Sequence, residues 1–198
     1  MDLLNRTKQI LFSPKTKWLT VDSENNTSSF VVTKYVLLLA AIPAVAAFIG
    51  YGIIGYSVLG YHFGSIGFGI KQAIIQYITM VGGVYATAWV INILAESFGS
   101  QKSFDKAFSL VAYAYTPAFV GGIFHIHHSI SFLAGLISLY SLYLLYIGLT
   151  PMMKTPEEKR TGYFVVSLLV MIAAFVILSL LLTSIIIGSA YSVGRFRF

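Results

Sequence analysis

Long apolar stretches alternate with short polar connections along most of this chain. A helix that crosses a bilayer needs about 20 mostly apolar residues. Stretches of this kind run over Phe30–Tyr56, Ala73–Phe98, Phe104–Phe124, Ile130–Thr150 and Gly162–Gly188. The pattern therefore predicts an all-α fold, a polytopic membrane helix bundle with five transmembrane helices.

Proline and glycine mark the places where the predicted helices are expected to bend or end. Pro43 lies inside the first stretch and predicts a kink, and Pro151 is expected to close the fourth. Residues 60–69 are rich in glycine and aromatic side chains. Such a segment is too flexible for a span, so we expect an interfacial or re-entrant connection there.

The basic residues gather in alternate connections between these stretches. Ten of the 13 lie around the start of the first stretch, between the second and third, or between the fourth and fifth: Arg6, Lys8, Lys15, Lys17, Lys34, Lys102, Lys106, Lys154, Lys159 and Arg160. Lys71, Arg195 and Arg197 belong to the other side. Because Lys and Arg favour the cytoplasmic side of a membrane, this bias predicts a cytoplasmic N-terminus and a C-terminus outside.

The composition agrees with a membrane protein and narrows its partners. Hydrophobic residues make up 57% of the 198 positions and charged residues only 10%, whereas a soluble domain carries about 25% charged residues. The net charge of +6 would also suit a nucleic-acid-binding protein, but the basic residues flank apolar stretches and form no stripe. We therefore expect a multi-pass membrane protein, with anionic lipid headgroups and no nucleic acid as its partners.

The polar residues before the first span form a separate part of the predicted organisation. Residues 1–29 are expected to be a cytoplasmic, basic, amphipathic segment, and residues 30–198 a five-helix membrane domain. Apolar pairs at helical spacing predict a helix over Leu3–Phe12 that lies in the membrane interface, with a disordered basic tail as the alternative. No short apolar region resembles a signal peptide, so we expect no cleavage. The residues expected to contact lipid or a partner are Arg6, Lys8, Lys15, Lys17 and Trp18.

Three histidines form a cluster after the third apolar stretch, at His125, His127 and His128. Imidazole nitrogens bind zinc, copper or nickel. On a helix His125 and His128 would share a face, whereas His125 and His127 would share one in an extended loop. No carboxylate lies in the same connection to complete a ligand set. The cluster is a candidate metal site, and a polar turn that meets water and headgroups is the alternative.

Asn92 and Glu96 form a candidate polar patch at the end of the second stretch. Acids inside a membrane often mark ion or proton paths. The simpler interpretation is that the Glu96 carboxylate reaches water at the predicted cytoplasmic end, while Asn92 bonds to a neighbouring helix.

Motifs of known enzyme classes are missing. The sequence has no His-Glu-x-x-His, no Gly-x-Ser-x-Gly and no Walker loop. It also has no cysteine, which excludes disulfides, thiolate metal sites and cysteine nucleophiles. The sequence therefore predicts a protein that is not an enzyme and that has no cofactor.

Several motifs resemble those of the bacterial Yip1-domain family. Leu11–Trp18 is similar to the family's SPK-x-x-W opening, and Phe98–Phe104 followed by Tyr113–Pro117 is similar to its FGG…F…AY…P block. Leu139–Ser141 and Ile147–Leu149 lead into a charged connection before the last helix, as in the family. The resemblance implies a five-helix integral membrane protein and supplies no catalytic residue.

The eukaryotic members of this family act in vesicle traffic and associate with Rab GTPases. They carry a longer cytosolic N-terminal domain and an Asp-Leu-Tyr-Gly-Pro motif, and this chain has neither. The resemblance therefore implies a prokaryotic member without a Rab-related role, located in a bacterial inner (cytoplasmic) membrane.

The sequence leaves two hypotheses about function. The first is a membrane-organising or partner-binding protein, which would work through its N-terminal segment and the connections around Lys102 and Lys154, with a second copy or another membrane protein as partner. The second is a transporter or channel for a small solute or an ion, including a metal ion. Its path would use Asn92 and Glu96 at one end and the histidines at the other.

Overall fold

The computed structural model describes residues 2–58 and 61–173, which form helices and one short β-hairpin. Four helical stretches of the described residues are long and apolar enough to cross a membrane: Ser28–Ile54, Ile66–Leu94, Phe104–Ile126 and His128–Met153. A helical fold with several membrane-spanning stretches is thereby confirmed. The fifth predicted span, Gly162–Gly188, begins in a helix over residues 157–173 and otherwise lies outside the described residues.

The first span is built from four consecutive helical segments. They are α3 (Ser28–Val31), the π-helical η1 (Val32–Val36), α4 (Leu37–Phe48) and the π-helical η2 (Ile49–Ile54). Pro43 lies inside α4. Gly55 ends the span with a φ of 71°, a conformation that favours glycine and lets the chain turn out of the helix.

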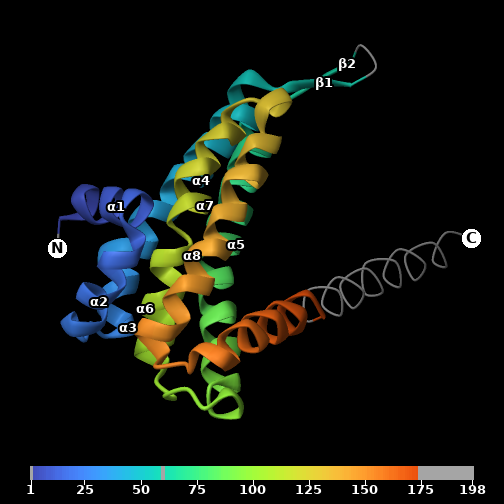
Figure 1. Ribbon diagram of the computed structural model, residues 1–198. Coiled ribbons are helices and arrows are strands. Elements are labelled where there is room, and N and C mark those ends of the chain that lie inside the picture. Colours follow the sequence, from blue (N-terminus) through green and yellow to red (C-terminus); the bar gives the residue numbers. More distant parts are fainter. Residues whose placement is uncertain (1, 59–60, 174–198) are drawn as a thin grey trace, which may run out of the picture.

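A β-hairpin connects the first span to the second. Strand β1 (Tyr56–Val58) pairs antiparallel with β2 (Tyr61–Phe63), so that Tyr56 lies opposite Phe63. The hairpin extends beyond the end of the helices (Figure 1). It replaces the first part of the connection that the sequence predicted as interfacial or re-entrant.

Helix α5 (Ile66–Leu94) begins inside that predicted connection, so the prediction of a non-helical segment over residues 60–69 is wrong for its second part. Ser65 caps the helix by accepting a hydrogen bond from the Phe68 amide at 3.2 Å. The sequence interpretation took the glycines of this segment as a source of flexibility, but Gly69 allows close helix packing. A Cβ atom on Gly69 would lie 2.4 Å from Cα of Gly52, so two glycines let the first and second spans touch.

The third span is interrupted near its middle. It consists of α6 (Phe104–Ala114), α7 (Thr116–Gly121) and the 3-10 turn η4 (Gly122–Ile126). Pro117 lies in the first turn of α7, where a helix tolerates proline because the amide at that position has no helical partner.

The fourth span is the continuous helix α8 (Phe132–Met153), which follows the 3-10 turn η5 (His128–Ile130). The prediction that Pro151 closes this helix is wrong, because Pro151 lies inside its last turn. The helix ends instead at Lys154, whose left-handed φ of 55° turns the chain away.

Two helices precede the first span and pack against the bundle. Helix α1 (Leu3–Phe12) has the predicted bounds, and α2 (Pro14–Glu24) lies beside α8 (Figure 1). Ile10, Trp18 and Val21 are at most 2% exposed and belong to the same apolar core as the spans. The N-terminal segment is therefore folded onto the bundle and is not a disordered tail.

Helix α6 lies at the centre of the described fold. Every residue from Ala107 to Ala114 is buried. Helices α5 and α8 contact it, and so do α3 and α1. Since the spans alone do not surround α6, the N-terminal helices complete its cover.

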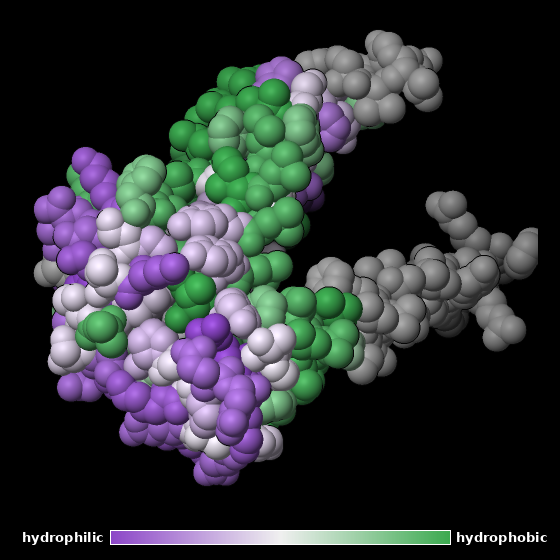
Figure 2. Space-filling model, in the orientation of Figure 1, coloured by the Kyte–Doolittle hydropathy of each residue, from purple (hydrophilic) through white to green (hydrophobic). Residues whose placement is uncertain are grey.

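Hydrophilic and hydrophobic surfaces separate along the bundle. We call the end formed by α2, η3 (Glu96–Phe98), residues 99–103 and residues 154–160 the polar end, and the opposite end the hairpin end. Hydrophilic residues cover the polar end, whereas the half toward the hairpin is largely hydrophobic (Figure 2). The basic connections that the sequence assigned to one side thus gather at one end.

Two glycines of α8 provide a matched test of how closely α2 and α6 pack against that helix. A Cβ atom on Gly148 would lie 2.4 Å from Leu110 Cδ1 and 2.9 Å from Trp18 Cε2, whereas one on Gly135 would meet no described atom within 4 Å. We expect Gly148→Ala to lower the free energy of unfolding by about 1–3 kcal/mol, because the indole and α6 must shift. Gly135→Ala should leave it unchanged or slightly raised. Thermal unfolding of both variants in one detergent checks this, and equal melting temperatures would contradict it.

Candidate functional site

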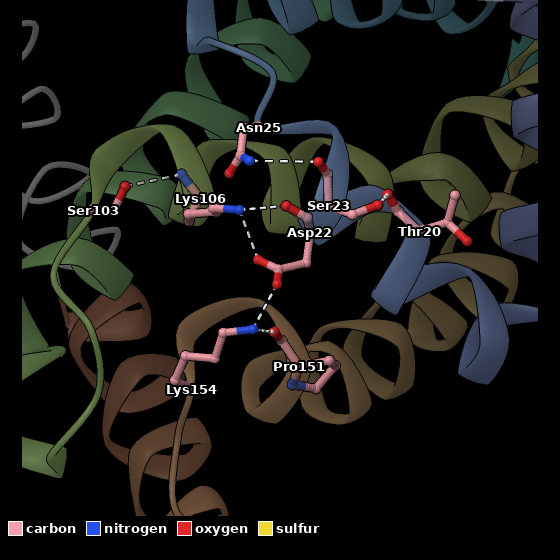
Figure 3. Close-up of polar contacts among 8 residues, drawn as sticks. All are labelled: Thr20, Asp22, Ser23, Asn25, Ser103, Lys106, Pro151 and Lys154. Carbon is pink, nitrogen blue, oxygen red and sulfur yellow. Dashed lines mark hydrogen bonds and ion pairs between the residues drawn. The ribbon is translucent and has the colours of Figure 1, made fainter.

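One carboxylate holds together three parts of the polar end. Asp22 lies in the last turn of α2 and faces two lysines (Figure 3). Lys106 Nζ lies 2.7 Å from Asp22 Oδ1, and Lys154 Nζ lies 2.5 Å from Oδ2. Lys106 also donates to the backbone carbonyl of Asp22 at 2.5 Å. Because Lys106 lies in the first turn of α6 and Lys154 follows α8, the contact joins segments that are far apart in sequence.

The electrostatics of Asp22 follow from this position. Partial burial alone would raise the pKa of its carboxyl, but the two lysine ammonium groups outweigh burial and hold the pKa below the ordinary value of 3.8. The side chains of Asp22 and Lys106 are each 19% exposed, whereas that of Lys154 is 54% exposed. The Asp22–Lys106 pair is therefore the better shielded of the two.

A second charged contact lies beneath α1. Arg6 forms an ion pair with Glu24, and its guanidinium carbon lies 5.5 Å from the centre of the Tyr113 ring. The Arg6 side chain is only 10% exposed. Tyr113 in turn packs edge-on against Tyr35, whose hydroxyl lies 2.7 Å from Thr116 Oγ1. A polar cluster thus connects α1 to the break between α6 and α7.

Two further basic residues of the polar connections also have acidic neighbours. Lys102 pairs with Glu96 at 3.3 Å, and Arg160 pairs with Glu157 at 2.8 Å. The loop of Lys102 is fixed to the loop of Lys154 as well, through a Ser100–Thr155 hydroxyl contact of 2.9 Å. These connections are therefore internally tied, and their cations are largely neutralised.

Only part of the predicted lipid- or partner-contacting set lies on the surface. Lys8 and Lys15 are exposed, and Lys17 is half-buried. Arg6 and Trp18 lie inside the protein, which corrects their assignment as surface contacts. Trp18 is buried because the absence of a side chain at Gly148 leaves room for its indole against α8.

Three large apolar side chains lie on the outer face of the N-terminal helices near these lysines. Leu4 is 71% exposed, Phe12 is 81% exposed and Leu19 is 65% exposed. We call Leu4, Lys8, Phe12, Lys15 and Leu19 the N-terminal face. Its mixture of apolar and basic side chains is typical of a helix that lies in a membrane interface or binds a partner.

Asn92 and Glu96 lie in different surroundings. Asn92 Oδ1 is buried and has no hydrogen-bond partner among the described residues. Glu96 begins η3, and its exposed side chain pairs with Lys102.

The three histidines do not converge. Among the described residues, no group of three or more His, Asp or Glu side chains could hold a metal ion. His125 is half-buried and lies in the 3-10 turn η4. His127 has an extended backbone, and its ring accepts a hydrogen bond from the Ser129 amide at 3.3 Å. The ring of His128 stacks on that of Tyr56. The backbone changes direction between them, so their spacing in sequence does not become a ligand set.

Sequence reasoning missed Asp22, Tyr35 and Thr116 as organising residues. The resemblance to the AY…P block pointed to Thr116 and its neighbours, whose hydroxyls and rings prove to meet the first span. No local pattern distinguishes Asp22 from other acids, because its partners Lys106 and Lys154 lie far away in sequence.

Comparison with known proteins gives a family match over most of the chain. A family model described as the Yip1 domain matches residues 8–191. Two proteins named inner membrane protein YohC, from Escherichia coli K12 and from Escherichia coli O6:H1 (strain CFT073), are each 30% identical over 187 residues. The match covers 91% of this chain and 95% of each relative. No solved structure matches.

The Asp22 contact predicts a defined dependence of stability on pH. A carboxylate with a lowered pKa contributes stability above its unfolded pKa, and this contribution is lost as pH falls from about 4 through the lowered value. We expect Asp22→Asn to lower the free energy of unfolding by about 1–3 kcal/mol near pH 7, and this difference from the unsubstituted chain should shrink below about pH 4. Thermal unfolding over this pH range measures both effects.

Glu96→Gln is the control for that measurement, because it removes an exposed ion pair worth about 0–1 kcal/mol. A loss of stability as large as that of Asp22→Asn would show that the carboxylate of Asp22 has no special role.

Proposed function

This chain belongs to the Yip1 domain family, and we propose that it is a non-enzymatic protein that organises the membrane or binds a partner through its N-terminal face. It is a multi-pass inner membrane protein, with helices able to span a bilayer and inner membrane proteins as relatives. The single observation that carries the proposal is the N-terminal face itself. Its apolar and basic side chains point outward from helices whose other side is locked into the core.

The locked position of these helices favours a docking role over a passive tail. Ile10 and Trp18 anchor α1 and α2 in the apolar core, and ion pairs of Asp22 with Lys106 and Lys154 connect α2 to α6 and to the end of α8. A surface held in this way loses little conformational freedom when it binds, which lowers the cost of association. The face can therefore act as one rigid platform against anionic headgroups or a protein partner.

The loops around Lys102 and Lys154 contribute less to this proposal. Lys102 and Lys154 already pair with Glu96 and Asp22 of the same chain. An ion-paired lysine presents little free charge to a third group, so we assign the working surface to α1 and α2 and not to these loops.

The proposed orientation places the polar end in the cytoplasm. Its support is the gathering of α2, residues 99–103 and residues 154–160 at one end of the bundle, together with the bias of Lys and Arg toward the cytoplasmic side. The N-terminal face would then meet the anionic inner leaflet.

A transporter or channel is the second candidate function. The observation that favours it is the buried Asn92 Oδ1, which has no hydrogen-bond partner among the described residues and could meet a polar solute. Glu96 and the histidines do not add to the support for a transport path. Glu96 pairs with Lys102, and the three histidines do not converge.

A fluorophore on the N-terminal face tests membrane docking. The chain has no cysteine, so Leu4→Cys carries an environment-sensitive probe at one site. In vesicles with anionic lipid we expect the probe to be shielded from an aqueous quencher, and adding Lys8→Gln should weaken docking about fivefold, because one lysine near an anionic surface contributes about 1 kcal/mol. A probe at Gln101→Cys serves as the water-exposed control. Equal quenching at both positions would contradict docking onto the bilayer.

The same cysteine-free chain tests the orientation. A membrane-impermeant maleimide added to intact spheroplasts should leave Gln101→Cys unlabelled and should label it only after the membrane is opened. Phe63→Cys, at the exposed tip side of the hairpin end, should be labelled in both cases. The reverse pattern would place the polar end outside.

A further inference from the structure

A groove runs along the outside of the molecule between α2 and α8. It consists of two adjoining hollows of about 400 Å³ and 420 Å³ that share Lys15 and Tyr143. Phe12 belongs to the first hollow, and Thr150 and Arg160 belong to the second. Volumes of this size are typical of sites for small ligands or headgroups.

Two buried polar atoms at the second hollow have no hydrogen-bond partner in the described part of the chain. They are Thr150 Oγ1 and Arg160 Nε. Buried polar atoms in proteins are nearly always satisfied. A rotation of either side chain toward the hollow would let it donate to a ligand that accepts hydrogen bonds. The guanidinium of Arg160 is already oriented by Glu157 at 2.8 Å and by the Tyr146 ring at 4.6 Å.

The charges of the groove favour an anion. Lys15 and Arg160 supply two positive charges, and Glu157 supplies one negative charge, which leaves one net positive charge in the lining. The hydroxyls of Thr150 and Tyr143 add neutral donors. A phosphodiester carries one negative charge and accepts several hydrogen bonds, so it complements this lining.

The exposed face of α8 continues the groove toward the hairpin end. Leu136, Leu139, Tyr140 and Tyr143 follow one another at helical spacing, and all four are at least 36% exposed. The rings of Tyr140 and Tyr143 stack with their centres 5.6 Å apart. An apolar path of this kind suits acyl chains that begin at a headgroup in the groove.

We propose that the α2–α8 groove binds one anionic glycerophospholipid, with its phosphodiester between Lys15 and Arg160 and its acyl chains along α8. The site rests on the proposed function, because it gives the membrane-facing side of α2 a defined lipid. Thr150 and Tyr143 donate to the phosphodiester, and Arg160 Nε completes its contacts.

Native mass spectrometry of the full-length protein tests the site directly. The protein is taken gently from bilayers that contain phosphatidylglycerol and phosphatidylethanolamine, and the fraction carrying phosphatidylglycerol is measured. The unsubstituted chain should retain one such lipid, and Thr150→Val and Arg160→Gln should each weaken its retention about tenfold, because each removes a donor to a charged group. Lys8→Gln, an exposed lysine outside the groove, should retain lipid like the unsubstituted chain. Equal retention in Thr150→Val and Lys8→Gln would overturn the site.

Further arms separate this site from its alternatives. Arg160→Gln also removes the contacts with Glu157 and Tyr146, so the isosteric Thr150→Val decides the outcome if Arg160→Gln does not fold. Retention of phosphatidylethanolamine in preference to phosphatidylglycerol would overturn the anionic selectivity. Equal stabilisation of the delipidated protein by inorganic phosphate and by phosphatidylglycerol in thermal unfolding would identify a free phosphate as the ligand and overturn the lipid.

The outcomes also distinguish this inference from the proposed function. Thr150→Val should leave the shielding of a probe at Leu4→Cys intact, whereas Lys8→Gln should reduce that shielding and leave the bound lipid in place. Unchanged phosphatidylglycerol retention in Thr150→Val, together with the expected shielding of the Leu4→Cys probe, would overturn the groove alone.

Discussion

The packing of the Trp18 indole against Gly148 fixes where the N-terminal helices lie, and other contacts follow from it. Because α8 has no side chain at this position, α2 can approach both α8 and α6 closely. That approach brings Asp22 within reach of Lys106 and Lys154. It also seats α1 over α6, where Arg6 meets Tyr113. One missing methyl group therefore determines the position of a whole helical pair and of its ion pairs.

The sequence predicted the elements that depend on local composition. Four spans and the helix over Leu3–Phe12 follow from apolar length and helical spacing, which require no knowledge of neighbours. The predictions that Pro151 closes the fourth span and that the glycines of residues 60–69 prevent a helix were wrong. The effect of these residues on a helix depends on what packs against them and not only on their intrinsic preference. The same limit explains Trp18. Because its ring is amphipathic, the sequence predicted a position at the level of the lipid headgroups. The indole is instead buried against Gly148, a contact that the local sequence does not reveal.

The candidate site was harder to predict than the fold for an electrostatic reason. All seven acidic residues belong to the N-terminal segment, to the polar end or to the first turn of α6. Lys and Arg determine membrane orientation almost independently of acids, so acids can be placed there to pair with selected lysines without reversing the topology. Which lysines remain free, such as Lys8 and Lys15, is decided by tertiary contacts. For the same reason, the spacing of the three histidines in sequence suggested a metal site that the described residues do not form.

The dependence of α1 and α2 on α8 has a consequence for biogenesis. The ribosome produces Trp18 and Asp22 early, but Gly148 and Lys154 emerge only after three spans have been made. Until then Ile10 and Trp18 have only part of their apolar cover, and Asp22 lacks one of its two lysines. The N-terminal pair must wait beside the insertion machinery in an incompletely packed state, open to chaperones and proteases. The first part of the chain to be synthesised is thus among the last to reach its final packing, and its docking makes insertion of the fourth span a condition for a protected N-terminus.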